Sequence, residues 1–278
     1  MMFTEQLKHA QAANDSLLCV GLDPEPSRFP GAWAGDASRI FEFCAAIVDA
    51  TRDLVIAFKP QIAHFAANRA EDQLERLIAH IREVAPQVPV ILDAKRGDIG
   101  STAEHYAREV FERYRADAVT LSPFMGFDSI APYLAYPGKG AILLCRTSNP
   151  GGADLQGQRL AGADGEAGEF LYERIARLAD GAWNRSGQLG LVVGATYPAE
   201  IARVRDLAPT LPLLIPGIGA QGGDAAATVR AGSRGGATII VNSSRAVLYA
   251  SAGQDFAGAA RRVAETTRSA LNAARPAR

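Results

Sequence analysis

Eight short apolar segments recur along the chain, and each is followed by residues whose apolar positions have helical spacing. The segments run continuously rather than alternating with polar residues, which is typical of strands buried on both faces of a sheet. They occupy residues 17–23, 54–60, 88–95, 118–123, 141–148, 189–196, 212–219 and 237–244. The pattern predicts strands and helices in regular alternation.

Strands and helices in series are joined by right-handed crossovers and form a parallel sheet. Eight such units within 278 residues predict an α/β fold of the (β/α)8 TIM-barrel type, with an extra N-terminal helix over residues 4–14. A doubly wound open sheet is the alternative, but no linker or low-complexity segment divides the chain. We therefore expect residues 1–278 to form a single barrel domain. The longer helices are expected over residues 37–51, 71–84 and 254–273.

The composition excludes several classes of function. The formal net charge of −1 provides no basic field of the kind that nucleic-acid binding needs. Three cysteines lie within apolar segments without metal-site spacing, so we expect reduced thiols. The N-terminal residues are amphipathic and charged, unlike a signal peptide, and no apolar segment reaches membrane-spanning length. We expect a cytoplasmic protein that binds neither nucleic acid nor membrane.

The segment VILDAKRGDIGSTAEHY carries the densest charge at any predicted strand end. Because side chains alternate along a strand, Asp93 and Lys95 should point to the same side. Asp98 follows on a turn, and Ser101 with Glu104 has the spacing of a capping box that starts a helix. Two acids and a lysine are costly to bury unless they pair.

In a (β/α)8 barrel, the C-terminal ends of the strands form the active site. A structural ion-pair cluster is the alternative interpretation, but such a cluster has no reason to gather at one rim. The strand ends of this chain carry Asp23, Lys59, Asp93, Lys95, Ser122, Ser148, Thr196, Gly217, Gly219, Ser244 and Arg245. We therefore expect the active site at this rim.

A glycine-rich turn follows the seventh strand. Gly217, Gly219 and Gly222 match the dinucleotide fingerprint, but that fingerprint belongs to the first βαβ unit and needs an acid about 20 residues later. The turn fits instead the phosphate site that barrels build after strands 7 and 8. Gln221 can donate from its amide, and Arg245 can hold two phosphate oxygens. A surface salt bridge is the alternative for Arg245.

Two glycine-containing loops are candidates for moving lids over this rim. Residues 149–165 form the longer one, which begins directly after Ser148, and residues 220–224 form the other. Long loops without secondary structure are often lids. Disorder without function is the alternative for the longer loop.

The charges at the rim favour one kind of chemistry. A Schiff-base lysine must be a free amine, whereas the neighbouring carboxylates hold Lys95 as an ammonium ion. An ammonium suits a proton donor aimed at a carbanion. An ionised Asp93, held between Lys95 and Lys59, would repel a substrate carboxylate and favour its loss as CO2. Decarboxylation of a phosphorylated substrate without cofactor or metal fits, although acids could recruit Mg²⁺.

The stretch LDAKRGDIGST resembles the signature of the orotidine 5′-phosphate decarboxylase family. The likeness covers nearly the whole chain and includes VGLDP, FKPQ, TSNPG, PGIGAQGGD and NSSRA. The longer loops resemble the bacterial branch of that family with longer chains. The resemblance implies a cofactor-independent carboxy-lyase that converts orotidine 5′-phosphate to UMP and CO2 in de novo pyrimidine biosynthesis.

The resemblance also implies roles for the matched residues. Those implied in catalysis are Lys95, Asp93, Lys59 and Asp98, with Lys95 protonating C6 of the pyrimidine after CO2 leaves. Those implied in substrate binding are Asp23, Ile99, Thr102, Ser148, Gly219, Gln221, Ser244 and Arg245. The resemblance further implies that Asp23 and Lys59 touch the ribose hydroxyls, that Ser148 binds the pyrimidine edge, and that Gln221 and Arg245 hold the phosphate.

Asp98, Ile99 and Thr102 would reach into the site of a second subunit, so the resemblance implies a homodimer with shared sites. His64 departs from the apolar or aromatic residue expected after the FKPQ motif, and we interpret it as a packing residue.

Two other functions stay open. A Mg²⁺-dependent sugar-phosphate decarboxylase or synthase of the same barrel superfamily keeps the D-x-K-x-x-D spacing but is not expected to carry Lys59. A non-catalytic nucleotide-binding barrel would need the phosphate site without the charge array.

Overall fold

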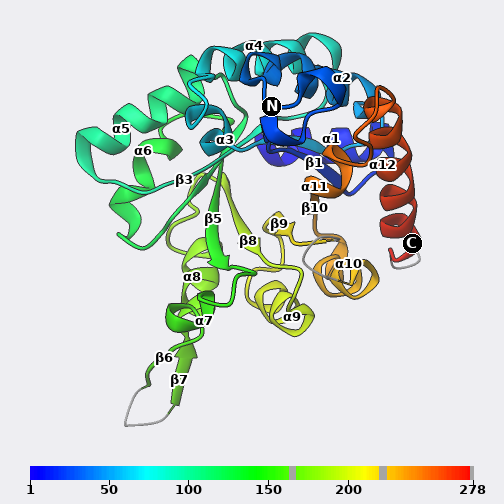
Figure 1. The fold of residues 1–278 in the computed structure, drawn as a ribbon. Helices are drawn as coiled ribbons and strands as arrows, with labels where there is room; N and C mark the ends of the chain where they lie inside the picture. Colours follow the sequence, from blue (N-terminus) through cyan, green and yellow to red (C-terminus); the bar gives the residue numbers. More distant parts are fainter. Residues whose placement is uncertain (163–166, 219–223, 276–278) are drawn as a thin grey trace.

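Eight parallel strands form the centre of the molecule in a computed structural model, which describes residues 1–162, 167–218 and 224–275 (Figure 1). The strands are β1 (Leu18–Leu22), β2 (Ala57–Pro60), β3 (Ile91–Arg96), β4 (Ala118–Leu121), β5 (Gly140–Arg146), β8 (Leu189–Val193), β9 (Leu213–Pro216) and β10 (Ile239–Ser243). Their order in the sheet is β2-β1-β10-β9-β8-β5-β4-β3. Bridges from Phe58 to Val90 and from Gln61 to Asp93 join the two outer strands, so the sheet closes into a barrel.

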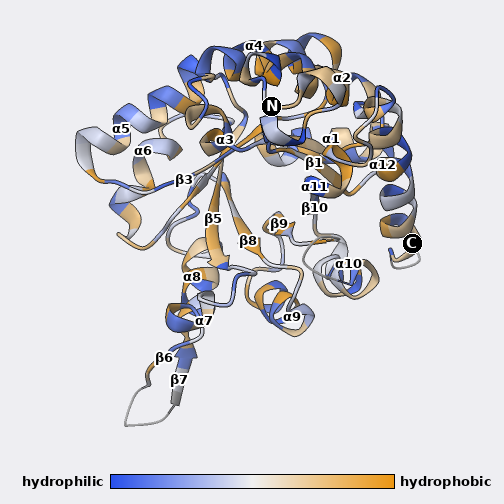
Figure 2. Cartoon of the chain, viewed as in Figure 1, coloured by the Kyte–Doolittle hydropathy of each residue, from blue (hydrophilic) through white to orange (hydrophobic). Residues whose placement is uncertain are grey.

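Helices follow the strands and pack around them. They are α1 (Phe3–Asn14), α2 (Ile40–Thr51), α3 (Ile62–Ala66), α4 (Glu71–Val84), α5 (Gly100–Arg108), α6 (Ala131–Leu134), α7 (Gly152–Leu155), α8 (Leu171–Asp180), α9 (Pro198–Leu207), α10 (Ala225–Gly232), α11 (Arg245–Leu248) and α12 (Phe256–Ala273). Figure 2 shows apolar strands and helices with polar outer faces. This arrangement confirms the predicted (β/α)8 barrel.

The apolar core has two parts. The larger part lies between the strands and the surrounding helices. The smaller part lies inside the barrel, and every strand region contributes at least one buried side chain to it. These side chains are Cys19, Ile56, Ala57, Ile91, Ala118, Ile142, Val192, Leu214 and Ile240. Phe3, Leu7 and Ala10 of α1 pack against this inner cluster. The predicted N-terminal helix therefore closes the N-terminal end of the barrel and leaves the C-terminal end open.

Gly140 shows how closely α1 is seated. A Cβ atom at this position, the first of β5, would come within 2.4 Å of the Phe3 ring. Real Cβ contacts are not that short, so the Phe3 ring occupies space that only a glycine leaves free. The seating of α1 thus depends on one small residue at the start of a strand.

Two local predictions are wrong. Helix α5 begins at Gly100, one residue earlier than predicted, and no side chain caps it. The Ser101–Glu104 capping box is therefore absent; Asp98 instead accepts a hydrogen bond from the backbone N–H of Ile99 (2.9 Å). The loop over residues 149–165 was expected to lack secondary structure, but it contains α7 and strand β6 (Arg159–Ala161).

Strand β6 pairs with β7 (Ala167–Phe170) in an antiparallel hairpin that projects from the barrel (Figure 1). The hairpin sequence is polar and glycine-rich, so it has no apolar run that would have indicated strands. The other predicted lid, residues 220–224, lies outside the described residues except for Asp224, which caps α10.

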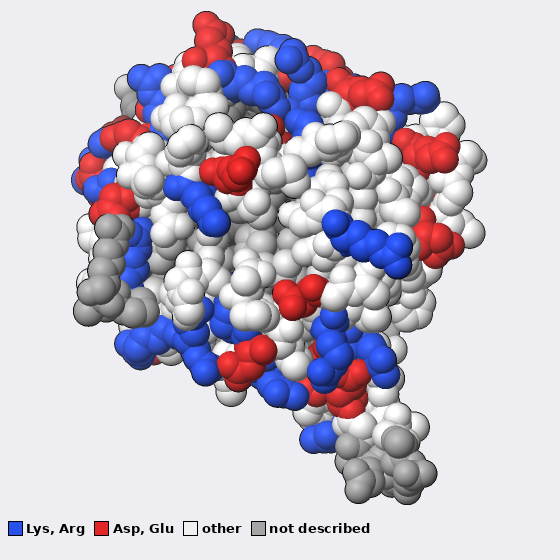
Figure 3. All heavy atoms as spheres, turned by 180° about the vertical axis from the view of Figure 1, so that it is seen from behind, with Lys and Arg blue, Asp and Glu red and all other residues white. Residues whose placement is uncertain are grey.

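The surface carries no dominant sign of charge on the face shown in Figure 3, where acidic and basic side chains are interspersed around a largely uncharged centre. This distribution agrees with the net charge of −1. Among the helices that the structure describes, none has the length and hydropathy needed to cross a membrane.

Candidate active site

Three charged side chains meet at the open end of the barrel. Asp93 of β3 is buried, with 7% of its surface exposed. Lys59 of β2 lies 2.8 Å from its Oδ2, and Lys95 lies 2.7 Å from its Oδ1. Asp23, directly after β1, lies 4.0 Å from the Lys59 ammonium. The structure therefore brings together four residues that the sequence analysis placed at the ends of three different strands.

The array keeps its members charged. Burial by itself would raise the pKa of Asp93, but the ammonium groups of Lys59 and Lys95 outweigh it and hold the pKa well below its usual value. Burial would likewise lower the pKa of Lys59, whereas Asp93 and Asp23 hold it above its usual value. The carboxylate and the lysine are thus ionised at neutral pH.

Lys95 reaches Asp93 through an irregular backbone rather than a regular strand. The β3–β4 register pairs Leu92 with Val119 and then Arg96 with Leu121, so three residues of β3 lie opposite Thr120 alone. Lys95 has a φ angle of +46°, in the left-handed region that side-chain-bearing residues rarely adopt. The prediction that Asp93 and Lys95 share a side is confirmed, but a bulge rather than simple alternation places them there.

Two adjoining cavities meet at this array. The larger one, about 490 Å³, is bounded on one side by the loop after β5, including Thr147, Ser148 and Gln156. The smaller one, about 240 Å³, extends toward the start of α11. Both are lined by Lys59, Asp93, Lys95 and Pro216. A ligand that spans both cavities would therefore pass directly over the charged array.

Close packing fixes Ser148 at the edge of the larger cavity. A Cβ atom on Gly194 would lie within 2.8 Å of the Ser148 backbone, so only glycine admits the loop at this distance. The side chain of Gln156, just after α7, accepts from the backbone N–H of Thr147 (2.8 Å). Below the loop, the buried Arg146 pairs with Glu200 (2.9 Å). The loop is thereby held against the barrel, and Ser148 faces the cavity as predicted.

The smaller cavity collects polar groups from β1, α3 and β10. Asp23, Ser244 and Arg245 line it, as predicted from the strand ends. The Oδ1 atoms of Asp23 and Asn242 are buried and accept no hydrogen bond from the described residues. Buried acceptors of this kind are satisfied when a ligand supplies hydroxyl or N–H donors.

Sequence reasoning missed several residues that line the site. His64 faces the smaller cavity, and its Nδ1 lies 3.1 Å from the carbonyl oxygen of Pro24. The interpretation of His64 as a packing residue is therefore incomplete, because its side chain also lines the cavity. Asn242 lies within the quoted NSSRA motif and could have been recognised as a polar strand-end residue. Thr120 sits inside an apolar run, and nothing in the sequence distinguishes it.

The residues expected to serve a second subunit do not line either cavity of their own chain. Ile99 is 51% exposed, Thr102 is also exposed, and Asp98 is half-buried. Gly219 and Gln221, predicted at the phosphate site, lie outside the described residues. Within the described ranges, no group of three or more His, Cys, Asp or Glu side chains is placed to hold a metal ion.

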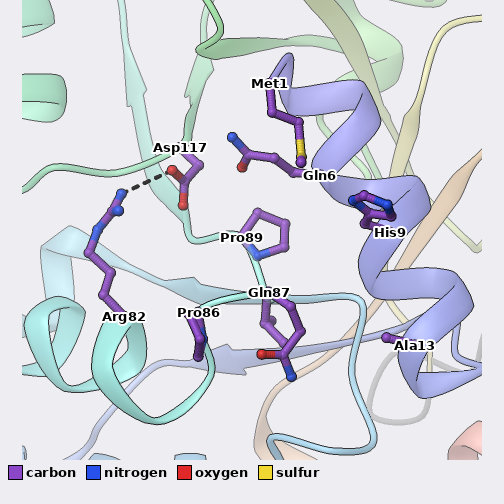
Figure 4. Close-up of a pocket in the computed structure, with 10 residues that line it drawn as sticks. Met1, Gln6, His9, Ala13, Arg82, Pro86, Gln87, Pro89 and Asp117 are labelled. Atoms are coloured by element: carbon purple, nitrogen blue, oxygen red, sulfur yellow. Dashed lines mark hydrogen bonds and ion pairs between the residues drawn. The ribbon is translucent and has the colours of Figure 1, made fainter.

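A further hollow of about 530 Å³ lies at the opposite end of the barrel, between α1 and residues 86–89 (Figure 4). Gln6 and His9 of α1 face it from one side, and Arg82 and Asp117 from the other. Arg82 and Asp117 pair with each other across 2.9 Å. Because its charged groups are used internally, and because barrel chemistry occurs at the C-terminal end, the active-site assignment stays with the first two cavities.

Comparisons with known proteins agree with this geometry. The family model described as "Orotidine 5'-phosphate decarboxylase / HUMPS family" matches residues 16–262. The chain is 77% identical over 275 residues to the orotidine 5′-phosphate decarboxylase of Polaromonas naphthalenivorans, covering 99% of this chain and 97% of that protein. It is 74% identical to the protein of the same name from Methylibium petroleiphilum, covering 99% and 100%.

Among solved structures, the OMP decarboxylase of Leishmania donovani superposes with a TM-score of 0.82 at 40% identity, covering 98% of this chain and 99% of that one. The matches extend across the barrel and its open rim rather than over an isolated motif. The chain therefore belongs to the orotidine 5′-phosphate decarboxylase family.

Proposed function

We propose that the protein is a carboxy-lyase that converts orotidine 5′-phosphate to UMP and CO2 in pyrimidine biosynthesis, without a metal or organic cofactor. The observation that carries this proposal is the Lys59–Asp93–Lys95 array between two cavities. The relatives that bear the decarboxylase name match nearly the full chain, which supports the same reaction in one barrel domain over residues 1–278.

The array suits the loss of CO2 from C6 of the pyrimidine. With the substrate carboxylate placed beside Asp93, two negative charges oppose each other in a largely desolvated site. Cleavage of the bond between C6 and the carboxyl carbon leaves the electron pair on C6 and relieves the repulsion. The Lys95 ammonium stabilises the carbanion, donates a proton to C6, and recovers a proton from solvent.

The remaining contacts follow the two cavities. Ser148 in the larger cavity binds the pyrimidine edge, and Arg245 at the far end of the smaller cavity binds the phosphate together with Ser244. The ribose then lies between them, where the free Oδ1 of Asp23 accepts from a hydroxyl group. Gly219 and Gln221 complete the phosphate site in this proposal.

We infer further that the active form is a homodimer in which Asp98, Ile99 and Thr102 enter the partner's site. An apolar surface supports this inference. Phe124 and Phe127 in the connection after β4 are 79% and 40% exposed. Helix α5, which the exposed Ile99 directly precedes, contacts the Phe127–Ser129 turn. Exposed apolar surface of this kind beside an active-site rim is typical of an interface between subunits.

A cytoplasmic location is part of the proposal. All three cysteines, Cys19, Cys44 and Cys145, are buried free thiols. Unbridged cysteines are usual in reducing compartments, and a nucleotide-forming enzyme meets its substrate there.

The Mg²⁺-dependent sugar-phosphate enzyme is the second candidate. The position of Lys59 argues against it. Its ammonium lies between the carboxylates of Asp23 and Asp93, where a divalent cation would otherwise bind. The Lys59 ammonium already neutralises these acids and would repel a metal ion at that point. A non-catalytic nucleotide-binding barrel is disfavoured because it has no use for the charged array.

Release of CO2 from carboxyl-labelled orotidine 5′-phosphate tests the proposal. We expect full activity after exhaustive treatment with EDTA and no stimulation by added Mg²⁺. Activity that EDTA abolishes and Mg²⁺ restores would support the sugar-phosphate class of chemistry. Tight nucleotide binding without any CO2 release would support a binding protein.

A further inference from the structure

Thr120 occupies a central place beneath the charged array, although no functional role has so far been given to it. The residue is buried, with 1% of its surface exposed, and lies on β4. Its Oγ1 donates a hydrogen bond to Oδ1 of Asp93 (2.8 Å). The same oxygen accepts from the backbone N–H groups of Ala94 and Lys95, each at 3.0 Å. One hydroxyl group therefore contacts three consecutive residues of β3.

The bulge in β3 explains why such a hydroxyl is needed. Regular pairing between β3 and β4 stops after Leu92 and resumes at Arg96. In a regular parallel ladder, successive N–H groups donate in alternation to carbonyl oxygens of the two flanking strands. Buried N–H groups without acceptors are unfavourable. The Thr120 hydroxyl replaces the missing carbonyl acceptors at Ala94 and Lys95.

The same contacts stabilise an unusual backbone. The left-handed conformation of Lys95 is unfavourable for a residue with a side chain, and it persists only where surrounding contacts hold it. That conformation returns the Lys95 side chain to Asp93, where Nζ and the Thr120 hydroxyl share Oδ1 as acceptor. The position of the ammonium thus depends on the backbone that Thr120 holds.

We propose that Thr120 is a positioning residue, which holds Lys95 in its left-handed conformation and orients the Asp93 carboxylate, so that the ammonium meets C6 of the substrate. The inference rests on the proposed decarboxylation for its kinetic readout. Thr120 acts through Lys95 and Asp93 and not by touching the reacting atoms.

Three substitutions separate the hydroxyl from the rest of the side chain. Thr120→Val keeps the shape and removes the hydroxyl, and we expect kcat to fall about 10- to 100-fold, because small displacements of a catalytic group have effects of this size. KM should change by less than about threefold, since the substrate contacts remain. Thr120→Ser keeps the hydroxyl and should retain kcat within about threefold. Thr120→Ala should resemble Thr120→Val and replaces it if that variant does not fold.

Thr51→Val is the matched control. Thr51 is also fully buried, and its hydroxyl donates to the carbonyl oxygen of Ile47 within α2, away from the site. The substitution should lower the melting temperature without changing kcat. If Thr120→Val acted only by lowering stability, both variants would show a lower melting temperature and the same kcat. A positioning role predicts a lower kcat at Thr120 alone.

Crystal structures of wild type and Thr120→Val provide a readout that does not need the reaction. We expect Lys95 to leave its positive φ angle and its Nζ to move away from Asp93 Oδ1 in the variant. A wild-type protein without decarboxylase activity would contradict the proposed function, and the crystal structures would still decide the role of Thr120. Full kcat in Thr120→Val, or an unchanged Lys95 backbone in that variant, would overturn the inference.

Discussion

Two buried carboxylates, at opposite ends of the same barrel, have nearly the same surroundings. Asp93 at the open rim is 7% exposed and accepts from two lysines and the hydroxyl of Thr120. Asp117, just before β4, is 8% exposed. Its carboxylate contacts Arg82 (2.9 Å) and Lys139 (3.5 Å) and accepts from the backbone N–H of Val90 (2.9 Å). Burial and charge alone do not distinguish them.

The difference lies in what else their cations contact. Arg82 also donates to the carbonyl oxygen of Arg115, and Lys139 donates to that of Ala116 (2.7 Å), so both cations join chain segments at the closed end. The ammonium groups of Lys59 and Lys95 each donate a hydrogen bond to Asp93 and to no other described residue. Their remaining N–H groups face the cavities. N–H donors that remain available to a ligand, rather than buried charge, therefore distinguish the proposed active site from a structural ion pair.

The two ends also differ in how burial acts on the lysines. Burial lowers the pKa of Lys139, and Asp117 offsets this effect only in part. At the open rim two carboxylates more than offset the burial of Lys59 and raise its pKa. The rim therefore holds the Lys59 ammonium charged more firmly than the closed end holds that of Lys139, and a firmly charged ammonium suits a positive site facing a carbanion.

The largest expected effect concerns the sharing of the rim between two subunits. In the proposed dimer with shared sites, Lys95→Ala removes the proposed proton donor from its own site and Asp98→Ala damages the partner's site. Each variant alone should therefore lose about 10³-fold or more in kcat. In a mixed dimer one site collects both lesions and the other collects neither. A random one-to-one mixture, half of it heterodimer, should therefore recover about a quarter of the wild-type activity per chain.

The measurement is activity after subunit exchange of the two purified variants, with heterodimers confirmed by native mass spectrometry. Each variant exchanged with itself is the control. Heterodimers without any gain in activity would place Asp98 in the site of its own subunit. Each site would then be formed by one chain alone.

Arg245 extends the comparison to another cation whose N–H donors remain available to a ligand. Its guanidinium lines the smaller cavity and makes no hydrogen bond to the described residues. Arg245→Ala should lower kcat/KM, because a charge-assisted contact to the phosphate is lost. The loss should correspond to about 2–4 kcal/mol of transition-state stabilisation. Part of the loss can appear in kcat if phosphate binding drives closure of the site. Arg82→Ala at the closed end is the control and should leave kcat/KM unchanged; equal losses would mean that the phosphate site is misplaced.

A smaller effect is expected in the pH dependence of stability. Because the pKa of Asp93 is lower in the folded than in the unfolded protein, its ion pairs stabilise fully above the unfolded value of about 3.9 and lose their effect as the pH falls toward the folded value. The difference in unfolding free energy between wild type and Asp93→Asn should be constant from about pH 5 to 9. Below about pH 4 it should shrink by at most about 1.4 kcal/mol per pH unit. Urea unfolding at a series of pH values measures it, and a difference that grows on acidification would contradict the assignment.

The sequence was sufficient to predict the barrel and most of its rim. Continuous apolar runs marked all eight strands, and their polar end residues, such as Lys59 and Ser148, do line the cavities. This works because a parallel strand is buried on both faces and ends where the chain returns to solvent. The β6–β7 hairpin was missed because its strands are too short and polar for that pattern.

Details that depend on contacts between distant residues could not be predicted. Thr120 resembles any β-branched residue in a buried strand until the bulge in β3 is seen opposite it. The left-handed Lys95 is likewise invisible in the sequence, because a lysine gives no local preference for that conformation. His64 was interpreted as packing because only the fold places α3 beside the smaller cavity.

A paired comparison of Asp93→Asn and Asp117→Asn tests the central claim most directly. Both substitutions remove one charge from a buried carboxylate that has two cationic partners. We expect Asp93→Asn to lower kcat for CO2 release by about 10³-fold or more, because the carboxylate acts on the substrate and orients Lys95. Asp117→Asn should retain kcat within about threefold and lower the unfolding free energy by about 1–3 kcal/mol. Equal losses of kcat in the two variants, or an active Asp93→Asn protein, would contradict the assignment of the open rim as the catalytic site.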